Sequence, residues 1–205
     1  MSEYINPKIA VFLTALLIIL TGCSSPKLLP LTDDAVIVAF GDSLTAGYGV
    51  NKSDSYPMVL QEITGLKVIN SGVSGETTSE GLERLSDVLN KHQPDLVVLL
   101  EGGNDLLQKK KPQQIKQNLR SMIQIIQASG AQVLMVGVPE KKLFGSSLPL
   151  YSELSSELGV PLEEDIVASL MKRPSMKSDF VHFNKKGYKE LAMAIFEKLQ
   201  QAGAI

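Results

Sequence analysis

Short apolar runs alternate along the chain with longer amphipathic segments. Four of the runs are rich in Val, Ile and Leu and end at turn residues: Val36–Phe40, Lys67–Asn70, Leu96–Leu100 and Val133–Val138. Their continuous hydrophobicity predicts strands buried on both faces, as in a parallel sheet. Val160–Leu162 is a weaker fifth candidate, and its proline favours a position at the edge of the sheet.

The segments between these runs carry apolar residues at helical spacing. Pro112 stands where a first-turn proline belongs, and Thr78 is a candidate cap for a helix that continues through Leu82, Leu85 and Leu89. Two further stripes comprise Ile115, Leu119, Met122, Ile123 and Ile126, and then Tyr188, Leu191, Ala192, Ile195, Phe196 and Leu199. The alternation predicts an α/β protein, a three-layer α/β/α sandwich with a mostly parallel five-stranded sheet, over residues 35–205.

The N-terminus has a different pattern. Lys8 precedes an apolar run, Ile9–Leu20, which is short for a membrane span and has the length of a signal-peptide core. The run ends in LTGC, which resembles the lipobox of bacterial lipoproteins, and Cys23 is the single cysteine of the chain. The alternative is a plain secretory signal with an incidental cysteine.

The lipobox resemblance implies a signal peptide over residues 1–22 and a lipid on Cys23. Residues 23–34 would then form the lipidated cysteine and a short tether. Several acyl chains on one residue anchor a protein firmly, because each buried CH₂ contributes ~0.8 kcal/mol. Ser24, rather than Asp, follows the cysteine, and by the same resemblance this favours the outer membrane, facing the periplasm.

The composition of the chain argues against several classes of partner and cofactor. The chain is 44% hydrophobic and 20% charged, as in an ordinary globular protein. A net charge of −2 and the lack of a basic stripe argue against nucleic acid as a partner. One cysteine rules out an internal disulfide, and with only two histidines it argues against a zinc site. We expect neither a metal nor a cofactor.

Polar loops follow three of the predicted strands. These are Gly41–Thr45 (GDSLT), Asn70–Thr78 (NSGVSGETT) and Glu101–Asp105 (EGGND). In a parallel sheet all three lie at the same edge, where ligands bind. A fourth segment, Ser178–Asn184 (SDFVHFN), stands just before the last predicted helix.

Together the four segments resemble the SGNH, or GDSL, hydrolase superfamily, with Ser43, Gly72, Asn104 and His182 at its name-giving positions. The similarity covers about Ala35 to Leu199 and is nearest to the bacterial acyl thioesterases, arylesterases and lysophospholipases. It implies a flavodoxin-like fold and a serine esterase that needs no metal or cofactor.

Elementary chemistry gives each of these residues a role. A serine hydroxyl attacks well only when a base removes its proton, and His182 suits that role for Ser43. Asp179 precedes the histidine by three residues and is placed to orient its ring. The N–H groups of Ser43 and Gly72, with the Asn104 amide, would stabilise the oxyanion.

Other interpretations of these residues remain. One alternative is that Asp42 or Ser43 serves only as a helix cap, and Asp42 is either the acid of the triad or a residue that orders the turn. Ser74 is a rival nucleophile, although GVSG lacks the spacing of a nucleophile elbow. His92 is expected at a solvated helix end.

The segment after the fourth strand bears on the substrate. Its apolar residues, Leu143, Phe144, Leu148 and Leu150, either line an acyl groove or pack beneath a loop. A cell-envelope location favours lysophospholipids or small lipophilic esters over cytosolic acyl-CoA. We expect a monomer that acts on a small acyl-ester or lipid substrate. The alternatives are a carbohydrate O-deacetylase of the envelope and a lipid-anchored binding module with a dead site.

Overall fold

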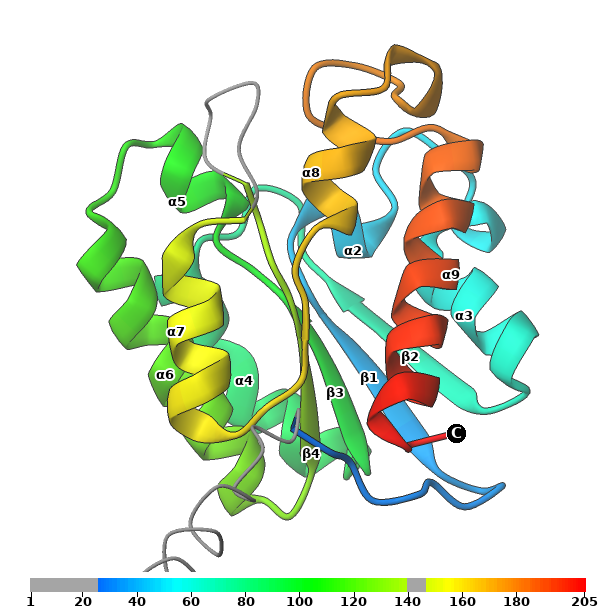
Figure 1. Ribbon diagram of the computed structural model, residues 1–205, viewed down its shortest axis with the longest axis vertical. Helices are drawn as coiled ribbons and strands as arrows, with labels where there is room; N and C mark the ends of the chain where they lie inside the picture. The colour runs from blue at the N-terminus through cyan, green and yellow to red at the C-terminus, as the bar shows by residue number, and fades with distance from the viewer. Residues whose placement is uncertain (1–25, 140–146) are drawn as a thin grey trace, which may run out of the picture.

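A five-stranded parallel sheet forms the centre of the molecule (Figure 1). The computed structural model describes residues 26–139 and 147–205. The strand order is β2-β1-β3-β4-β5, and every neighbouring pair is parallel. The strands are β1 (Val36–Gly41), β2 (Lys67–Gly72), β3 (Leu96–Leu100), β4 (Gln132–Val136) and β5 (Leu162–Glu163). The predicted α/β class and five-stranded sheet are confirmed.

Helices cover both faces of this sheet and complete the predicted three-layer sandwich (Figure 1). One layer contains α4 (Thr78–His92), α6 (Pro112–Ala128) and α7 (Pro149–Leu158). The other contains α3 (Tyr56–Thr64) and α9 (Lys185–Ala202), with α8 (Ile166–Met171) packed against α9. Two short helices follow β1 and β3, namely α2 (Ser43–Ala46) and α5 (Gly103–Leu107). Single 3-10 turns occupy Lys52–Asp54 and Pro174–Met176.

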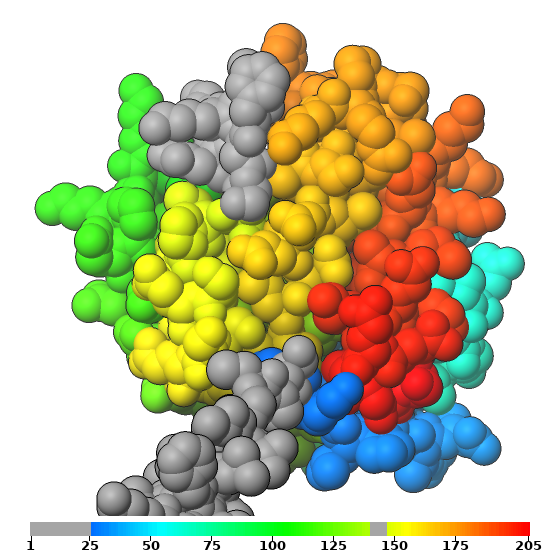
Figure 2. All heavy atoms as spheres, in the orientation of Figure 1, coloured from blue at the N-terminus to red at the C-terminus, as the bar shows by residue number. Residues whose placement is uncertain are grey.

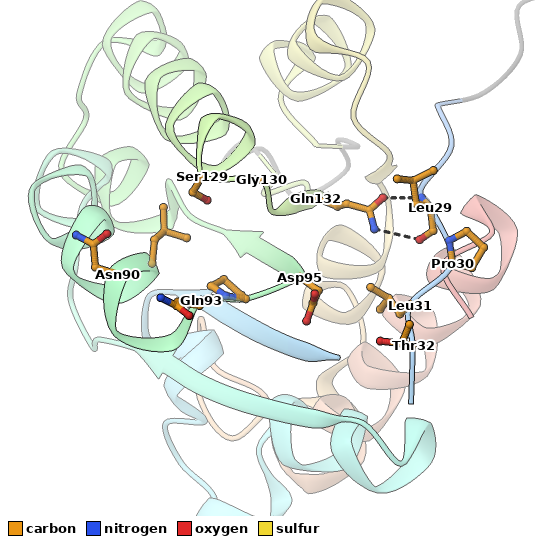
Figure 3. Close-up of a pocket in the computed structure, with 12 residues that line it drawn as sticks. Leu29, Pro30, Leu31, Thr32, Asn90, Gln93, Asp95, Ser129, Gly130 and Gln132 are labelled. Carbon is orange, nitrogen blue, oxygen red and sulfur yellow. Dashed lines mark hydrogen bonds between the residues drawn. The ribbon is translucent and has the colours of Figure 1, made fainter. Parts of the chain in front are cut away.

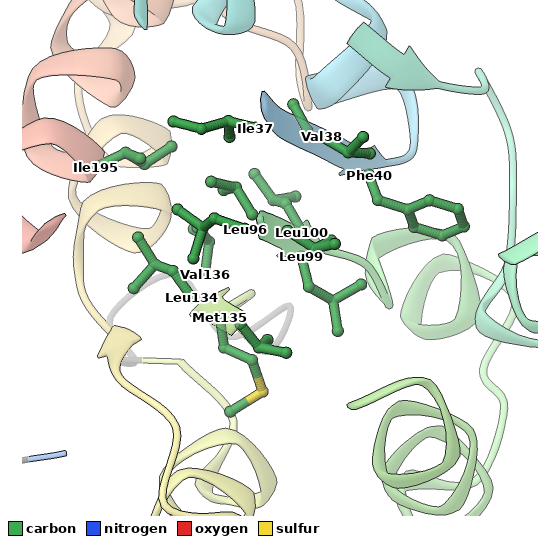
Figure 4. Close-up of a cluster of buried hydrophobic side chains, with 14 of the residues drawn as sticks. Ile37, Val38, Phe40, Leu96, Leu99, Leu100, Leu134, Met135, Val136 and Ile195 are labelled. Carbon is green, nitrogen blue, oxygen red and sulfur yellow. The ribbon is translucent and has the colours of Figure 1, made fainter. Parts of the chain in front are cut away.

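The core lies on both sides of β1, β3 and β4. Figure 4 shows Ile37 beside Ile195 of α9, whereas Phe40 points to the opposite side of the sheet. The prediction of strands buried on both faces holds for these three strands. It is wrong for β2, which lies at the edge of the sheet and exposes Lys67 and Asn70.

Two helix starts follow from local hydrogen bonding. Pro112 occupies the first turn of α6, as predicted, where a missing N–H costs nothing. The cap of α4 is Thr77, one residue before the predicted Thr78, and its N–H and hydroxyl both donate to the Glu80 carboxylate. Thr78 instead fixes the helix start to α5, because its N–H and hydroxyl donate to Asp105.

The chain joins the folded body before Ala35, the predicted start of the domain. The N–H of Leu28 donates to Ala202 O and that of Leu31 to Ala204 O, at 2.9 and 2.8 Å. Leu28 is 9% exposed and belongs to the core. This segment (blue) therefore lies against the C-terminal end of the chain (red), at the lower edge of Figures 1 and 2. No helix within the described ranges is long and apolar enough to cross a membrane.

Candidate active site

Ser43 stands at the sharp turn between β1 and α2. Gly41 ends the strand, and a Cβ there would lie 2.2 Å from Leu100 O, so a side chain cannot be accommodated. Asp42 caps α2, since its Oδ1 accepts the N–H of Leu44 at 2.9 Å. Asp42 therefore orders the turn by capping α2, and the Ser43 hydroxyl does not serve as the cap.

The Ser43 hydroxyl forms a hydrogen bond with a histidine far away in the sequence. Its Oγ lies 3.0 Å from His182 Nε2, and His182 Nδ1 lies 2.8 Å from Asp179 Oδ2. The other carboxylate oxygen of Asp179 accepts the N–H groups of Val181 and His182, both at 2.9 Å. The structure therefore places serine, imidazole and carboxylate in one hydrogen-bonded chain, an arrangement that can activate the hydroxyl.

The loop that carries His182 is closed by its own backbone. Ser178 N–H donates to His182 O at 3.0 Å, and the Asn184 side chain caps α9 by accepting the N–H groups of Lys186 and Gly187. Phe183 is fully buried and packs edge-on against Tyr188. The loop is thereby fixed to the core beside the reactive ring.

Electrostatics keep the carboxylate of this chain ionised. Although desolvation raises the pKa of Asp179, the hydrogen bonds from the His182 side chain and from the Val181 and His182 N–H groups lower it to about 2. A permanent negative charge beside Nδ1 favours the tautomer whose Nε2 faces Ser43 as a base. Tyr48 packs against the same ring, with centroids 4.3 Å apart, a contact that the sequence did not predict.

Asp42 and Glu101 are acids buried under this turn. Burial raises the pKa of Asp42 from 3.8 to about 6, against the hydrogen bond from Leu44. Burial, and then the nearby Asp42 charge, raise the pKa of Glu101 well above its usual range. Asp42 makes no hydrogen bond to His182 within the described chain, so the geometry favours Asp179 as the carboxylate that orients the imidazole.

Gly72 and Gly75, near the carboxyl end of β2, occupy different environments. Gly72 does not line the pocket: its N–H donates to Asn70 Oδ1 at 3.0 Å, and a Cβ there would meet the α2 backbone. Gly75 lines the pocket with Ser74 and has φ +85°, and its N–H has no partner among the described residues. Gly72 is the last residue of β2, whereas Gly75 lies in the loop that follows it. The pocket lining and the free N–H therefore favour Gly75 over the predicted Gly72 as an oxyanion donor.

Asn104 also lines the pocket, at the start of α5. Its Nδ2 donates to Glu76 O at 2.8 Å, and a second contact, to Asp42 Oδ2, is long at 3.4 Å. The first bond fixes the amide in orientation. The weakness of the second leaves one N–H available to a stronger acceptor.

A pocket of about 810 Å³ opens beside Ser43 and His182. Its size falls in the range of small-molecule sites, and its wall is largely apolar. The apolar residues of the wall are Leu44, Leu106, Leu107, Val138, Pro139, Ala168, Met171, Phe180 and Val181. Phe180 is 92% exposed at the rim.

The two predicted groove residues that the structure describes, Leu148 and Leu150, fall outside this wall. Leu148 and Leu150 are buried in the core, 7% and 6% exposed, so the structure favours the packing alternative for them. Leu143 and Phe144 lie outside the described residues, as does Cys23. Ser74 lines the pocket but no base bonds its hydroxyl in the described ranges, and His92 ends α4 at the opposite edge of the sheet. Those ranges contain no cluster of three or more side chains suited to a metal ion.

Comparison with known proteins agrees with this geometry. Residues 39–190 match the model of the GDSL-like lipase/acylhydrolase family. The chain is 32% identical over 172 residues to thioesterase 1/protease 1/lysophospholipase L1 of Escherichia coli K12, covering 80% of this chain and 83% of the relative. It is 36% identical over 149 residues to esterase TesA of Pseudomonas aeruginosa, covering 69% and 72%.

Solved structures give the same assignment. A crystal structure of TesA superposes with a TM-score of 0.74 at 27% identity, and the match covers 82% of this chain and 99% of that one. AlinE4, an SGNH-hydrolase family esterase, gives a TM-score of 0.65 at 32% identity and covers 85% and 100%. The chain therefore belongs to the GDSL-like lipase/acylhydrolase family and is an ester-bond hydrolase.

Proposed function

We propose that this protein hydrolyses acyl esters or thioesters through a covalent acyl-Ser43 intermediate. The hydrogen-bonded chain from Ser43 Oγ through His182 to Asp179, at the mouth of an apolar pocket, carries the proposal. The similarity to an E. coli thioesterase and lysophospholipase, and to an arylesterase of Vibrio mimicus at 36% identity, supports this range of substrates.

The first half of the reaction forms the acyl-enzyme. Ser43 Oγ attacks the acyl carbonyl carbon while its proton passes to His182 Nε2. The negative oxygen is stabilised by the N–H groups of Ser43 and Gly75 and by the Asn104 amide. Collapse of the tetrahedral intermediate expels the alcohol or thiol, which takes the proton from His182.

The second half releases the acid. Water enters, His182 removes its proton, and the resulting hydroxide attacks the acyl carbon of the intermediate. Collapse breaks the bond to Ser43 Oγ, which regains the proton. Asp179 stays ionised throughout and stabilises the imidazolium that forms twice in each cycle.

The wall of the pocket supports an acyl chain longer than acetyl. A chain that lies along Leu106, Val138 and Met171 buries apolar surface on both sides, a gain of roughly 25 cal/mol per Å². An acetyl group leaves most of this wall in water. A carbohydrate O-deacetylase removes only an acetyl group and has no longer acyl chain to place along this wall.

A labelling experiment tests the proposal. The folded protein is treated with a fluorophosphonate and assayed with p-nitrophenyl esters from acetyl to palmitoyl, beside Ser43→Ala and the control Ser74→Ala. We expect labelling and turnover in the wild type and in Ser74→Ala and none in Ser43→Ala, with chains longer than acetyl preferred. Absence of labelling and of Ser43-dependent turnover refutes the enzyme. Activity limited to acetyl esters favours the deacetylase.

We further propose that Cys23 carries a lipid and that the protein is held at the envelope by it. The described chain begins beside the C-terminal end of α9, at the amino edge of the sheet, whereas Ser43 lies at the carboxyl edge. Only a few residues separate Cys23 from Leu28, so an anchor there holds the amino edge toward the membrane and leaves the pocket facing away. Palmitate labelling of wild type and Cys23→Ala tests this, and equal labelling of both refutes it.

A further inference from the structure

Arg84 joins the loops that surround the reactive serine. It lies in the second turn of α4, and its guanidinium makes a two-point ion pair with the Glu76 carboxylate. Nη1 donates to Ser71 Oγ and Nη2 to Ser71 O, both at 2.9 Å, and Nη2 also lies 3.5 Å from Gly41 O. One side chain therefore holds the ends of β1 and β2 and the loop that follows β2.

The guanidinium is placed for strong contacts. Its Cζ lies 3.9 Å from the centroid of the Phe40 ring, a cation–π geometry, and the Arg84 side chain is only 24% exposed. The Glu76 side chain is 3% exposed. A charge-assisted, two-point pair in such surroundings fixes geometry as well as charge.

Glu76 connects this pair to the oxyanion donors. Its carbonyl oxygen accepts the Asn104 amide at 2.8 Å, and it directly follows Gly75 in the chain. The two other oxyanion donors, the Gly75 N–H and the Asn104 amide, are thus connected to Glu76, whose carboxylate pairs with Arg84. The backbone of this loop is further held by hydrogen bonds from Glu76 N to Val73 O and from Val73 N to Gly41 O, and the Glu76 side chain also contacts the buried Glu101 carboxyl group.

We propose that Arg84 is a positioning residue of the esterase, which acts through Glu76 to set the Asn104 amide and the Gly75 N–H where the oxyanion forms. The inference rests on the proposed function of the preceding section. Arg84 does not line the pocket and touches no reacting atom. Its contribution belongs to the transition state, so its loss lowers kcat rather than raising KM.

The test compares Arg84→Gln with Arg120→Gln. Arg120 makes a two-point pair with Glu157, at 2.9 and 2.7 Å, on the outer face of α6 and α7, away from the site. With a p-nitrophenyl ester, we expect Arg84→Gln to lose about 10- to 100-fold in kcat with KM changed less than threefold, while Arg120→Gln keeps wild-type values. Thermal unfolding of each variant confirms that it is folded at the assay temperature.

Two further variants separate positioning from charge and from folding. Arg84→Lys keeps the charge beside Glu76 but cannot hold Glu76, Ser71 and Gly41 together, so it should restore stability and recover kcat only in part. In an Asn104→Ala background, the loss on adding Arg84→Gln should be at least threefold smaller than in the wild type, because one of its two targets is gone.

The possible failures are distinguishable. A wild type without Ser43-dependent turnover overturns the proposed function and this inference with it. An active wild type in which folded Arg84→Gln keeps its kcat, or loses equally in both backgrounds, overturns the inference alone. Full recovery by Arg84→Lys also overturns it, since charge would then suffice. If Arg84→Gln does not fold, the kcat of Arg84→Lys in the two backgrounds decides.

Discussion

The two edges of the sheet differ in how they treat charge. At the carboxyl edge, beside Ser43, lie all four of the acidic residues that are buried within the described ranges: Asp42, Glu76, Glu101 and Asp105. Glu76 has Arg84 and Asp105 has Thr78 as partners, whereas Glu101 Oε1 has no hydrogen-bond partner within those ranges. Buried carboxyl groups of this kind cost folding free energy.

The amino edge is held together by neutral and exposed groups. The Gln132 amide bonds both the N–H and the C=O of Leu29, as the dashed lines of Figure 3 show. Asp95 accepts the Val36 N–H at 2.7 Å, where water still reaches the pair. A pocket of about 690 Å³ lies between this segment and the ends of α4 and α6 (Figure 3).

The carboxyl edge of the sheet therefore lowers the stability of the fold, whereas the amino edge raises it. Groups at the carboxyl edge are arranged for charge that develops in a transition state, and removing some of them should leave a more stable protein. Groups at the amino edge fasten the entering chain, and removing them should cost stability without touching activity.

The largest expected effect is that of Asp179→Asn. The asparagine Oδ1 can still accept the Val181 and His182 N–H groups, but its NH₂ faces His182 Nδ1 and favours the wrong tautomer. We expect kcat to fall by about 10²–10⁴-fold. The free energy of unfolding at pH 7 should change little, because the Asp179 side chain is 45% exposed.

Steady-state kinetics with a p-nitrophenyl ester and urea unfolding measure the two quantities. Asp87→Asn, an exposed aspartate of α4, is the control and should change neither. A variant that keeps full kcat would show that another group orients His182.

The second effect is the pH dependence that Asp42 gives to stability. Its pKa is raised from 3.8 to about 6, so between these values the folded protein holds a proton that the unfolded chain has released. Stability therefore falls as pH rises from about 4 to about 6. At pH 7 the shift lowers the free energy of unfolding by about 3 kcal/mol relative to low pH, since one pKa unit is worth about 1.4 kcal/mol.

Asp42→Asn removes this contribution while its Oδ1 can still cap α2. We expect the variant to lose less stability than the wild type between pH 4 and pH 7, as measured by urea unfolding at several pH values. Glu101 gives a slope of the same sign in both proteins, and the difference between the curves reports Asp42 together with the effect of its charge on Glu101. Parallel curves would contradict the prediction, and Asp87→Asn is again the control.

Sequence patterns predicted the parts of the site that rest on strand ends. Ser43 and Asn104 follow β1 and β3, whose apolar runs are continuous, so their place at one edge followed from the parallel sheet. The β2 strand ends in Asn70–Gly72, which is polar because the strand lies at the edge of the sheet. The predicted strand, Lys67–Asn70, therefore ends two residues before the observed one. The family resemblance assigned the glycine donor to Gly72 in this stretch, whereas the pocket lining favours Gly75.

Other features depend on contacts that no local pattern encodes. Glu76 and Arg84 meet across a loop and two helical turns, a spacing that identifies no motif in the sequence. The apolar residues Leu148 and Leu150 fit a groove wall and a core position equally well until the surrounding elements are placed. Periodicity tells which residues are buried, but not against what.

The smallest expected effect lies at the amino edge, in Gln132→Ala. The change removes two hydrogen bonds to the Leu29 backbone, each worth about 0.5–1.5 kcal/mol and less where water can replace them. We expect a loss of about 1 kcal/mol in the free energy of unfolding, faster hydrogen exchange at the Leu28 and Leu31 amides, and an unchanged kcat. Gln124→Ala, on the exposed face of α6, is the control for the loss of a glutamine. A fall in kcat with exchange unaltered would mean that the amino edge contributes to catalysis, and the separation of the two edges would then fail.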